Sequence, residues 1–138
     1  LEFRRVLFRS MSISFPYTID ADKKIVRADA SGLTLTKELI VNSAKTFKND
    51  PLCDPEFDFI FDYSAILGID IPNEDFNAII KAEAKEKAYI GKVALVMGRK
   101  NTDYIYASLY ADVAPSDVQH MPKVFVTMKE AEQWIGER

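Results

Sequence analysis

The segment 57–64 reads Phe-Asp-Phe-Ile-Phe-Asp-Tyr-Ser and constrains the fold more than any other stretch of the chain. It is short, rich in aromatic residues, and bounded by an Asp-Pro pair before it and by Gly68 after it. Such a run is typical of a strand that is buried on both faces of a sheet. Its last residues, Asp62, Tyr63 and Ser64, are predicted to lie where this central strand leaves the core.

Further strands and helices are predicted around this central strand. The other strands are expected at 15–19, 24–30, 92–97 and 123–127, and the helices at about 36–48, 74–88, 102–113 and after Thr127. Turn residues between the first two strands predict an antiparallel hairpin. Beyond it, strands alternate with helices, which predicts parallel pairing and helices that cover the sheet. The predicted fold is therefore α/β, with a mixed five-stranded sheet covered by about four helices.

The domain organisation follows from length and charge. Residues 1–10 resemble the translation of a sequencing-library adapter and precede Met11, so we interpret them as a non-native leader. The remainder, 11–138, has the length of a single domain. Without the three Arg and one Glu of the leader, the 18 basic and 21 acidic residues leave a net charge of −5. This acidity argues against nucleic acid as a partner. The apolar runs are too short to span a membrane, so we expect a cytoplasmic protein.

The order of elements resembles the SpoIIAA-like fold of STAS domains and, more distantly, the fold of the lipid-binding CRAL-TRIO group. The segments that carry the resemblance are Tyr17–Asp20 with the hairpin after it, Gly32–Leu35, Asp54–Phe57 leading into Phe59–Asp62, and Val124–Ala131 with Trp134–Ile135. The chain is most similar to small bacterial stand-alone proteins of this fold. The resemblance implies a regulatory domain that acts through a protein partner.

One motif of the resemblance is altered. In anti-sigma-factor antagonists, a phosphorylatable hydroxyl follows an aspartate in the loop after the central strand. Asp62 and Ser64 match the end of that strand, and Asp70 matches the loop aspartate. Ile71 and Pro72 stand where the hydroxyl belongs, and neither can accept a phosphoryl group. The resemblance therefore does not extend to a kinase-driven switch.

The carboxyl ends of the parallel strands are the expected place for a ligand, as in other open α/β sheets. The candidate ligand-binding residues at this rim are Asp62, Ser64, Gly98, Arg99, Lys100 and Asn101. A glycine, two cations and a helix N-terminus suit an anion such as a phosphate or a lipid head group. The alternatives are a tight turn with two solvated cations, and an Asp62 that caps backbone N–H groups of the following loop.

Catalytic and metal sites are not predicted. His120 is the only histidine, and the chain has no Gly-x-Ser-x-Gly motif. Cys53 is the only cysteine, which excludes an intrachain disulfide and leaves too few ligands for a zinc site. Asp50 and Asp54 flank it and predict a raised pKa for its thiol. We therefore expect no catalytic residues, no metal and no cofactor.

Two functions stay open at this point. The first is a non-catalytic cytoplasmic regulatory or protein-interaction module of the STAS-like type, without the phosphorylatable Ser/Thr switch. The second is a binder of a lipid or small apolar-anionic ligand at the carboxyl-end rim, with a pocket between the sheet and the helix at 74–88 or 102–113. An enzyme would require an unrecognised site around Asp62, Arg99 and His120. The exposed edge of the hairpin leaves room for a homodimer.

Overall fold

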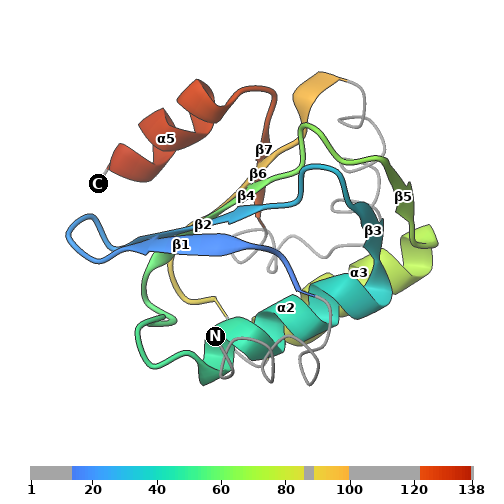
Figure 1. Ribbon diagram of the computed structural model, residues 1–138, viewed down its shortest axis with the longest axis horizontal. Coiled ribbons are helices and arrows are strands. Elements are labelled where there is room, and N and C mark those ends of the chain that lie inside the picture. Colours follow the sequence, from blue (N-terminus) through green and yellow to red (C-terminus); the bar gives the residue numbers. More distant parts are fainter. Residues whose placement is uncertain (1–13, 86–88, 100–121, 138) are drawn as a thin grey trace, which may run out of the picture.

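A mixed five-stranded sheet forms the centre of the protein. The computed structural model describes residues 14–85, 89–99 and 122–137 (Figure 1). The strands of this sheet are β1 (Tyr17–Asp20), β2 (Ile25–Asp29), β4 (Asp58–Asp62), β6 (Val93–Val96) and β7 (Lys123–Phe125). They lie in the order β1-β2-β4-β6-β7, with β1 antiparallel to β2 and all later pairs parallel. The predicted sheet and hairpin are confirmed, and β4 is the central strand.

Helices cover both faces of this sheet. The described residues contain three helices of at least nine residues, α2 (Lys37–Asn49), α3 (Asn73–Lys85) and α5 (Met128–Gly136). Helices α2 and α3 lie side by side on one face, and α5 lies on the other (Figure 1). The sequence predicted about four helices. The additional one, at 102–113, lies outside the described residues.

A second, two-stranded parallel sheet was not predicted. It is formed by β3 (Thr34–Thr36) and β5 (Gly68–Asp70), with Thr34 opposite Gly68 and Thr36 opposite Asp70. Strands of three residues are too short to show an alternating pattern, so pairing between distant segments decides them.

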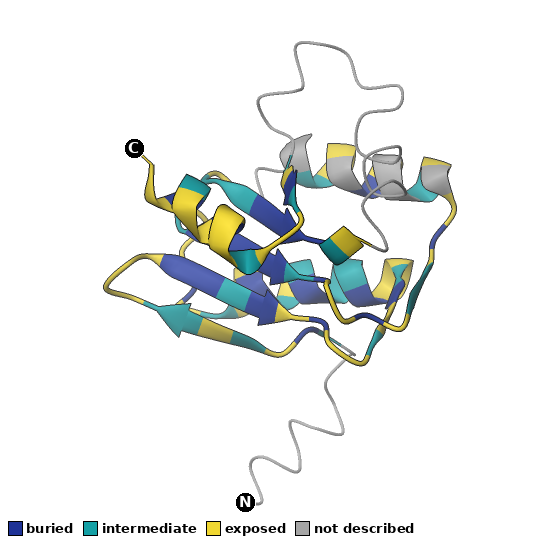
Figure 2. Ribbon diagram, turned by 90° about the horizontal axis from the view of Figure 1, so that it is seen from above, coloured by how far each residue is buried: buried dark blue, intermediate teal, exposed yellow. Residues whose placement is uncertain are grey.

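The core has two layers, one on each side of β4. Phe59 and Phe61 point towards α2 and pack with Phe47, while Ile60 points the other way and packs with Ala131 and Ile135 of α5. Burial on both faces of β4 is thus confirmed, and Figure 2 shows the buried central strands between exposed outer surfaces.

The prediction that Tyr63 leaves the core is wrong. Its side chain continues the alternation of Phe59 and Phe61 on the α2 face and is 4% exposed. Its ring lies 6.0 Å from that of Phe61 and 5.7 Å from that of Phe15. The strand pleat therefore extends the aromatic core one residue beyond the last ladder position of β4.

Threonine caps fix the starts of two helices. The hydroxyl of Thr36 accepts the backbone N–H of Leu39 at 3.1 Å and begins α2. The hydroxyl of Thr127 accepts the backbone N–H of Glu130 at 3.2 Å and begins α5. Such caps satisfy N–H groups that have no partner within the helix.

Candidate functional site

Two identical Asp-x-Ser turns lie next to each other at the carboxyl ends of β2 and β4. Asp29 and Asp62 are direct partners in the parallel pairing of these strands. One carboxylate oxygen of Asp29 accepts the backbone N–H of Ser31 at 2.9 Å and its hydroxyl at 2.6 Å. Asp62 makes the same two bonds with Ser64, at 3.0 and 2.6 Å. Asp62 therefore caps its own loop, which was the structural alternative for this residue.

Sequence reasoning missed Asp29 and Ser31 as part of this rim. The available signal was the repeat itself, Asp29-Ala-Ser31 and Asp62-Tyr-Ser64, at the ends of two strands. Two such turns lie side by side only if the strands that precede them are neighbours and parallel. The repeat therefore indicates a shared rim only once β2 and β4 are known to be neighbours.

Backbone hydrogen bonds hold the loops after β2 and β4 together. The N–H of Ala30 donates to the carbonyl of Asp62 at 3.0 Å, and the N–H of Gly32 donates to that of Ala65 at 3.0 Å. Further out, the N–H of Leu67 donates to the carbonyl of Leu33 at 2.8 Å. The two loops then continue into the pairing of β3 with β5. This continuous cross-linking makes the rim a rigid surface.

Gly98 joins this surface, as the sequence predicted for the strand that precedes it. Its φ of +66° is in the left-handed region that glycine favours. A Cβ added to Gly98 would lie 3.6 Å from the backbone and side chain of Ser64, so the two residues are in contact. The neighbouring Arg99 is exposed. The structure thus brings Asp62, Ser64, Gly98 and Arg99 to one rim, while Lys100 and Asn101 lie outside the described residues.

Hydrogen bonds at the rim favour the ionised carboxylate of Asp29. The side-chain hydrogen bond from Ser31, followed by the backbone bond, lowers the pKa of Asp29 below its usual range. On the α5 side of the sheet, a shallow depression of about 390 Å³ reaches the side chains of Asp29 and Asp62 and is bounded by Arg27 and Met128. The described part of the chain brings no three His, Cys, Asp or Glu side chains together in an arrangement that could hold a metal ion.

Leu67 is a large apolar side chain of this rim. It is 71% exposed, and its backbone N–H is hydrogen-bonded to the carbonyl of Leu33. Small or polar exposed residues lie along the same two loops: Asp29, Ser31, Gly32, Ser64 and Ala65. Val126, 36% exposed, follows β7 at the same end of the sheet, so Leu67 is the more exposed of two apolar side chains described there.

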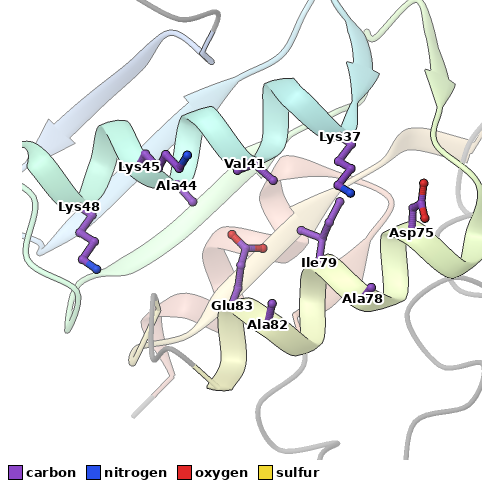
Figure 3. Close-up of a pocket in the computed structure, with 10 residues that line it drawn as sticks. All are labelled: Lys37, Val41, Ala44, Lys45, Lys48, Asp75, Ala78, Ile79, Ala82 and Glu83. Carbon is purple, nitrogen blue, oxygen red and sulfur yellow. The ribbon is translucent and has the colours of Figure 1, made fainter.

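A second concave feature lies between α2 and α3 and was not predicted in this position (Figure 3). It is a groove of about 460 Å³ with an apolar floor of Val41, Ala44, Ala78, Ile79 and Ala82. Its charged walls are formed by Lys37, Lys45 and Lys48 of α2 and by Asp75 and Glu83 of α3. The sequence placed a possible pocket between the sheet and a helix, whereas this groove lies between two helices.

Glu83 connects this groove to the aromatic core. Burial, and then the negative charge of Glu83, raises the pKa of Tyr89, whose hydroxyl also hydrogen-bonds to this carboxylate. The same two causes raise the pKa of Tyr63. Both phenols therefore remain protonated at neutral pH, and the hydroxyl of Tyr89 donates its hydrogen bond to the carboxylate of Glu83 on α3.

Cys53 has the properties expected from its sequence environment. It is buried, and burial followed by the charges of Asp50 and Asp54 raises the pKa of its thiol to about 11. A thiol with this pKa is almost entirely protonated at neutral pH and is a poor nucleophile.

Comparisons with known proteins add no family to this description. No protein-family model matches the chain, and a search of curated proteins found no match. Among the described residues, no helix has the length and apolar character needed to cross a membrane.

Proposed function

We propose that this protein is a non-catalytic, cytoplasmic protein-interaction module of the STAS-like type, and that the carboxyl-end rim is the surface that a partner protein contacts. The observation that carries the proposal is Leu67, a leucine that is 71% exposed although its backbone N–H is hydrogen-bonded to Leu33 of the neighbouring loop. An apolar anchor surrounded by polar groups is the usual anatomy of a protein interface.

The relief of the rim favours a protein over a small molecule. Small-molecule sites are concave and bury most of the ligand surface. Apart from Leu67, the exposed residues of the loops after β2 and β4 have short side chains or none, such as Ser31, Gly32, Ser64 and Ala65, and Arg99 adds a long exposed cation to the rim. Their backbone is already held by hydrogen bonds, so these loops would lose little conformational entropy when a partner binds.

The resemblance to STAS domains supports the same surface. Asp70, which corresponds to the loop aspartate of the antagonists, ends β5 and is exposed. Ile71, at the position of the missing hydroxyl, is buried, and Pro72 is exposed immediately before α3. In this proposal, binding at the rim is not regulated by phosphorylation of that loop, and the homodimer is one form that the interaction can take.

Affinity capture with two matched leucine variants tests the proposal. Leu67 and Leu52 are equally exposed, at 71% and 72%. Leu52 precedes β4 and therefore lies towards the opposite end of the sheet. Immobilised wild-type protein, Leu67→Asp and Leu52→Asp are each exposed to extract from the source cell, and the retained proteins are quantified by mass spectrometry.

The expected result is a partner that the wild type and Leu52→Asp retain and that Leu67→Asp loses. Truncating or charging an anchor residue typically costs about 2 kcal/mol or more, which is roughly a thirtyfold loss of affinity. Retention of the same proteins by all three would contradict a role for the rim. Circular dichroism of each variant confirms that the loss does not come from unfolding.

A further inference from the structure

We propose that the groove between α2 and α3 binds a single-chain anionic amphiphile, such as a long-chain fatty-acid carboxylate, with its head group held by Lys45 and Lys48. The groove lies on the helical layer and is separate from the rim, so this inference is independent of the proposed protein interaction. Three observations carry it: an apolar floor, a cationic wall, and an opposite wall whose acidic groups are engaged or distant.

The apolar floor results from small side chains where the two helices face each other. Ala44 of α2 and Ala78 and Ala82 of α3 fill little of the space between the helices. Ile79 is buried below them, whereas Ala78 and Ala82 are exposed. A volume of about 460 Å³ is within the usual range for small-molecule sites, roughly 300–1,000 Å³. An apolar chain laid on this floor would remove both alanines from water.

The groove also has the length of an extended acyl chain. Lys37 and Lys48 mark its two ends on α2, and at about 1.5 Å per helical residue they are roughly 16 Å apart. Figure 3 shows both lysines reaching from α2 towards α3. A linear chain fits such an elongated site better than a compact, branched molecule does.

The cationic wall selects the sign of the head group. Within the described residues, Lys37, Lys45 and Lys48 make no hydrogen bond or ion pair, and all three are exposed. Lys37 lies at the same end of the groove as Asp75, which offsets its charge (Figure 3). Lys45 and Lys48 lie near the other end, so two ammonium groups are available there to one anion.

Glu83 is the acidic group nearest this end, and its carboxylate reaches from α3 towards α2 (Figure 3). It accepts a hydrogen bond from Tyr89 of the aromatic core. Its charge remains on the α3 wall, which favours a head group on the α2 side, beside Lys45 and Lys48. A cationic amphiphile would instead meet two ammonium groups and is disfavoured.

The test uses the full chain, labelled with ¹⁵N, and oleate below its aggregation concentration. Binding is followed by amide chemical shifts, and shifts should concentrate in α2 and α3. Lys45→Gln combined with Lys48→Gln should weaken binding about tenfold or more, because both charge-assisted hydrogen bonds to the head group are lost. Lys23→Gln combined with Lys129→Gln removes the same charge from exposed positions outside the groove and should leave the affinity unchanged.

A second variant tests the apolar floor without changing charge. Ala78→Leu combined with Ala82→Leu fills the groove with side chains that helices accommodate well, and it should also weaken oleate binding. Dodecyltrimethylammonium, which has a cationic head, should bind more weakly than laurate, which has the same chain length. The proposal is overturned if the Lys45/Lys48 variant binds oleate as tightly as the wild type, if both head groups bind equally, or if the shifts map elsewhere. None of these outcomes bears on Leu67.

Discussion

The backbone carbonyl of Phe57 lies 2.6 Å from the position that a Cβ on Gly91 would occupy. A carboxylate oxygen of Asp58 lies 2.8 Å from the same position and accepts the backbone N–H of Lys92 at 2.9 Å. Asp58 is 1% exposed, so this bond is protected from water. The chain entering β6 is therefore held against the start of β4 at a distance that only glycine permits.

Replacement of Gly91 by alanine should destabilise the protein by about 1–3 kcal/mol, because the added methyl group forces the two backbones apart. Chemical denaturation followed by circular dichroism measures the change. Gly68→Ala is the matched control, since a Cβ at Gly68 has no neighbour within 4 Å. Equal stabilities of the two variants would show that the close approach at Gly91 is not required.

Removal of the Ser31 hydroxyl should raise the pKa of Asp29 towards the usual value for an aspartate. The side-chain hydrogen bond from Ser31 is the main cause of the lowered pKa in the folded protein. The stabilisation from this bond is present above the carboxyl pKa of the unfolded chain and is lost as the pH falls through the lowered pKa. Carboxyl ¹³C NMR titration of the wild type and Ser31→Ala measures the shift. Ser64→Ala, which affects the neighbouring turn, should leave most of the Asp29 shift in place.

The thiol of Cys53 should react slowly with iodoacetamide in the folded protein and quickly in denaturant. Burial, Asp50 and Asp54 raise its pKa to about 11, and the ordinary value is about 8.5. The folded state favours the protonated thiol. The stabilisation that results is complete below the pKa of the thiol in the unfolded chain and is lost as the pH rises towards 11. This expectation is tested by alkylation rates, measured by mass spectrometry from about pH 7 to about pH 9. Similar rates in the folded and unfolded chain would contradict it.

Lys92 should contribute to the docking of α5. Its ammonium group donates to the carbonyl of Trp134 at 2.7 Å and also to that of Glu137, and it lies 4.9 Å from the centre of the Trp134 ring. Lys92→Met keeps the aliphatic stem and removes these bonds, and the expected loss of stability is about 1–3 kcal/mol.

Lys123→Met is the control for Lys92→Met. Lys123 lies over the rings of Phe125 and Trp134, at 5.8 and 5.5 Å, and no hydrogen bond is recorded for it among the described residues. Its replacement should cost less than that of Lys92. Thermal unfolding measures the loss of stability in both variants. A larger loss for Lys123→Met than for Lys92→Met would contradict the role of the Lys92 hydrogen bonds in holding α5.

The sequence was sufficient for the elements that carry strong local signals. The aromatic alternation of Phe59 and Phe61 predicted the central strand. Thr34 and Thr36 were both possible caps for α2, and the structure shows Thr36 in that position, while Thr127 caps α5. The short strands β3 and β5 were missed because their pairing depends on contacts between distant segments rather than on an alternating pattern. Tyr63 was placed outside the core because its hydroxyl was given more weight than the pleat of the strand.

The rim was only partly accessible from sequence, and the groove was not. Asp62, Ser64 and Gly98 were expected together because strand ends converge in parallel sheets, and the structure brings them together. Asp29 required the knowledge that β2 is the neighbour of β4. The groove depends on the spacing of α2 and α3, and Ala44, Ala78 and Ala82 carry no local signal that distinguishes a groove floor from an ordinary helix surface.

Trp134 is the only tryptophan of the chain, and it lies on α5 beside Lys92 and Lys123. The aromatic cluster under α2 contains phenylalanine and tyrosine instead. Indole emission therefore reports on the attachment of α5 to the sheet. Unfolding followed by indole emission and by circular dichroism can thus show whether α5 separates together with the rest of the fold or before it.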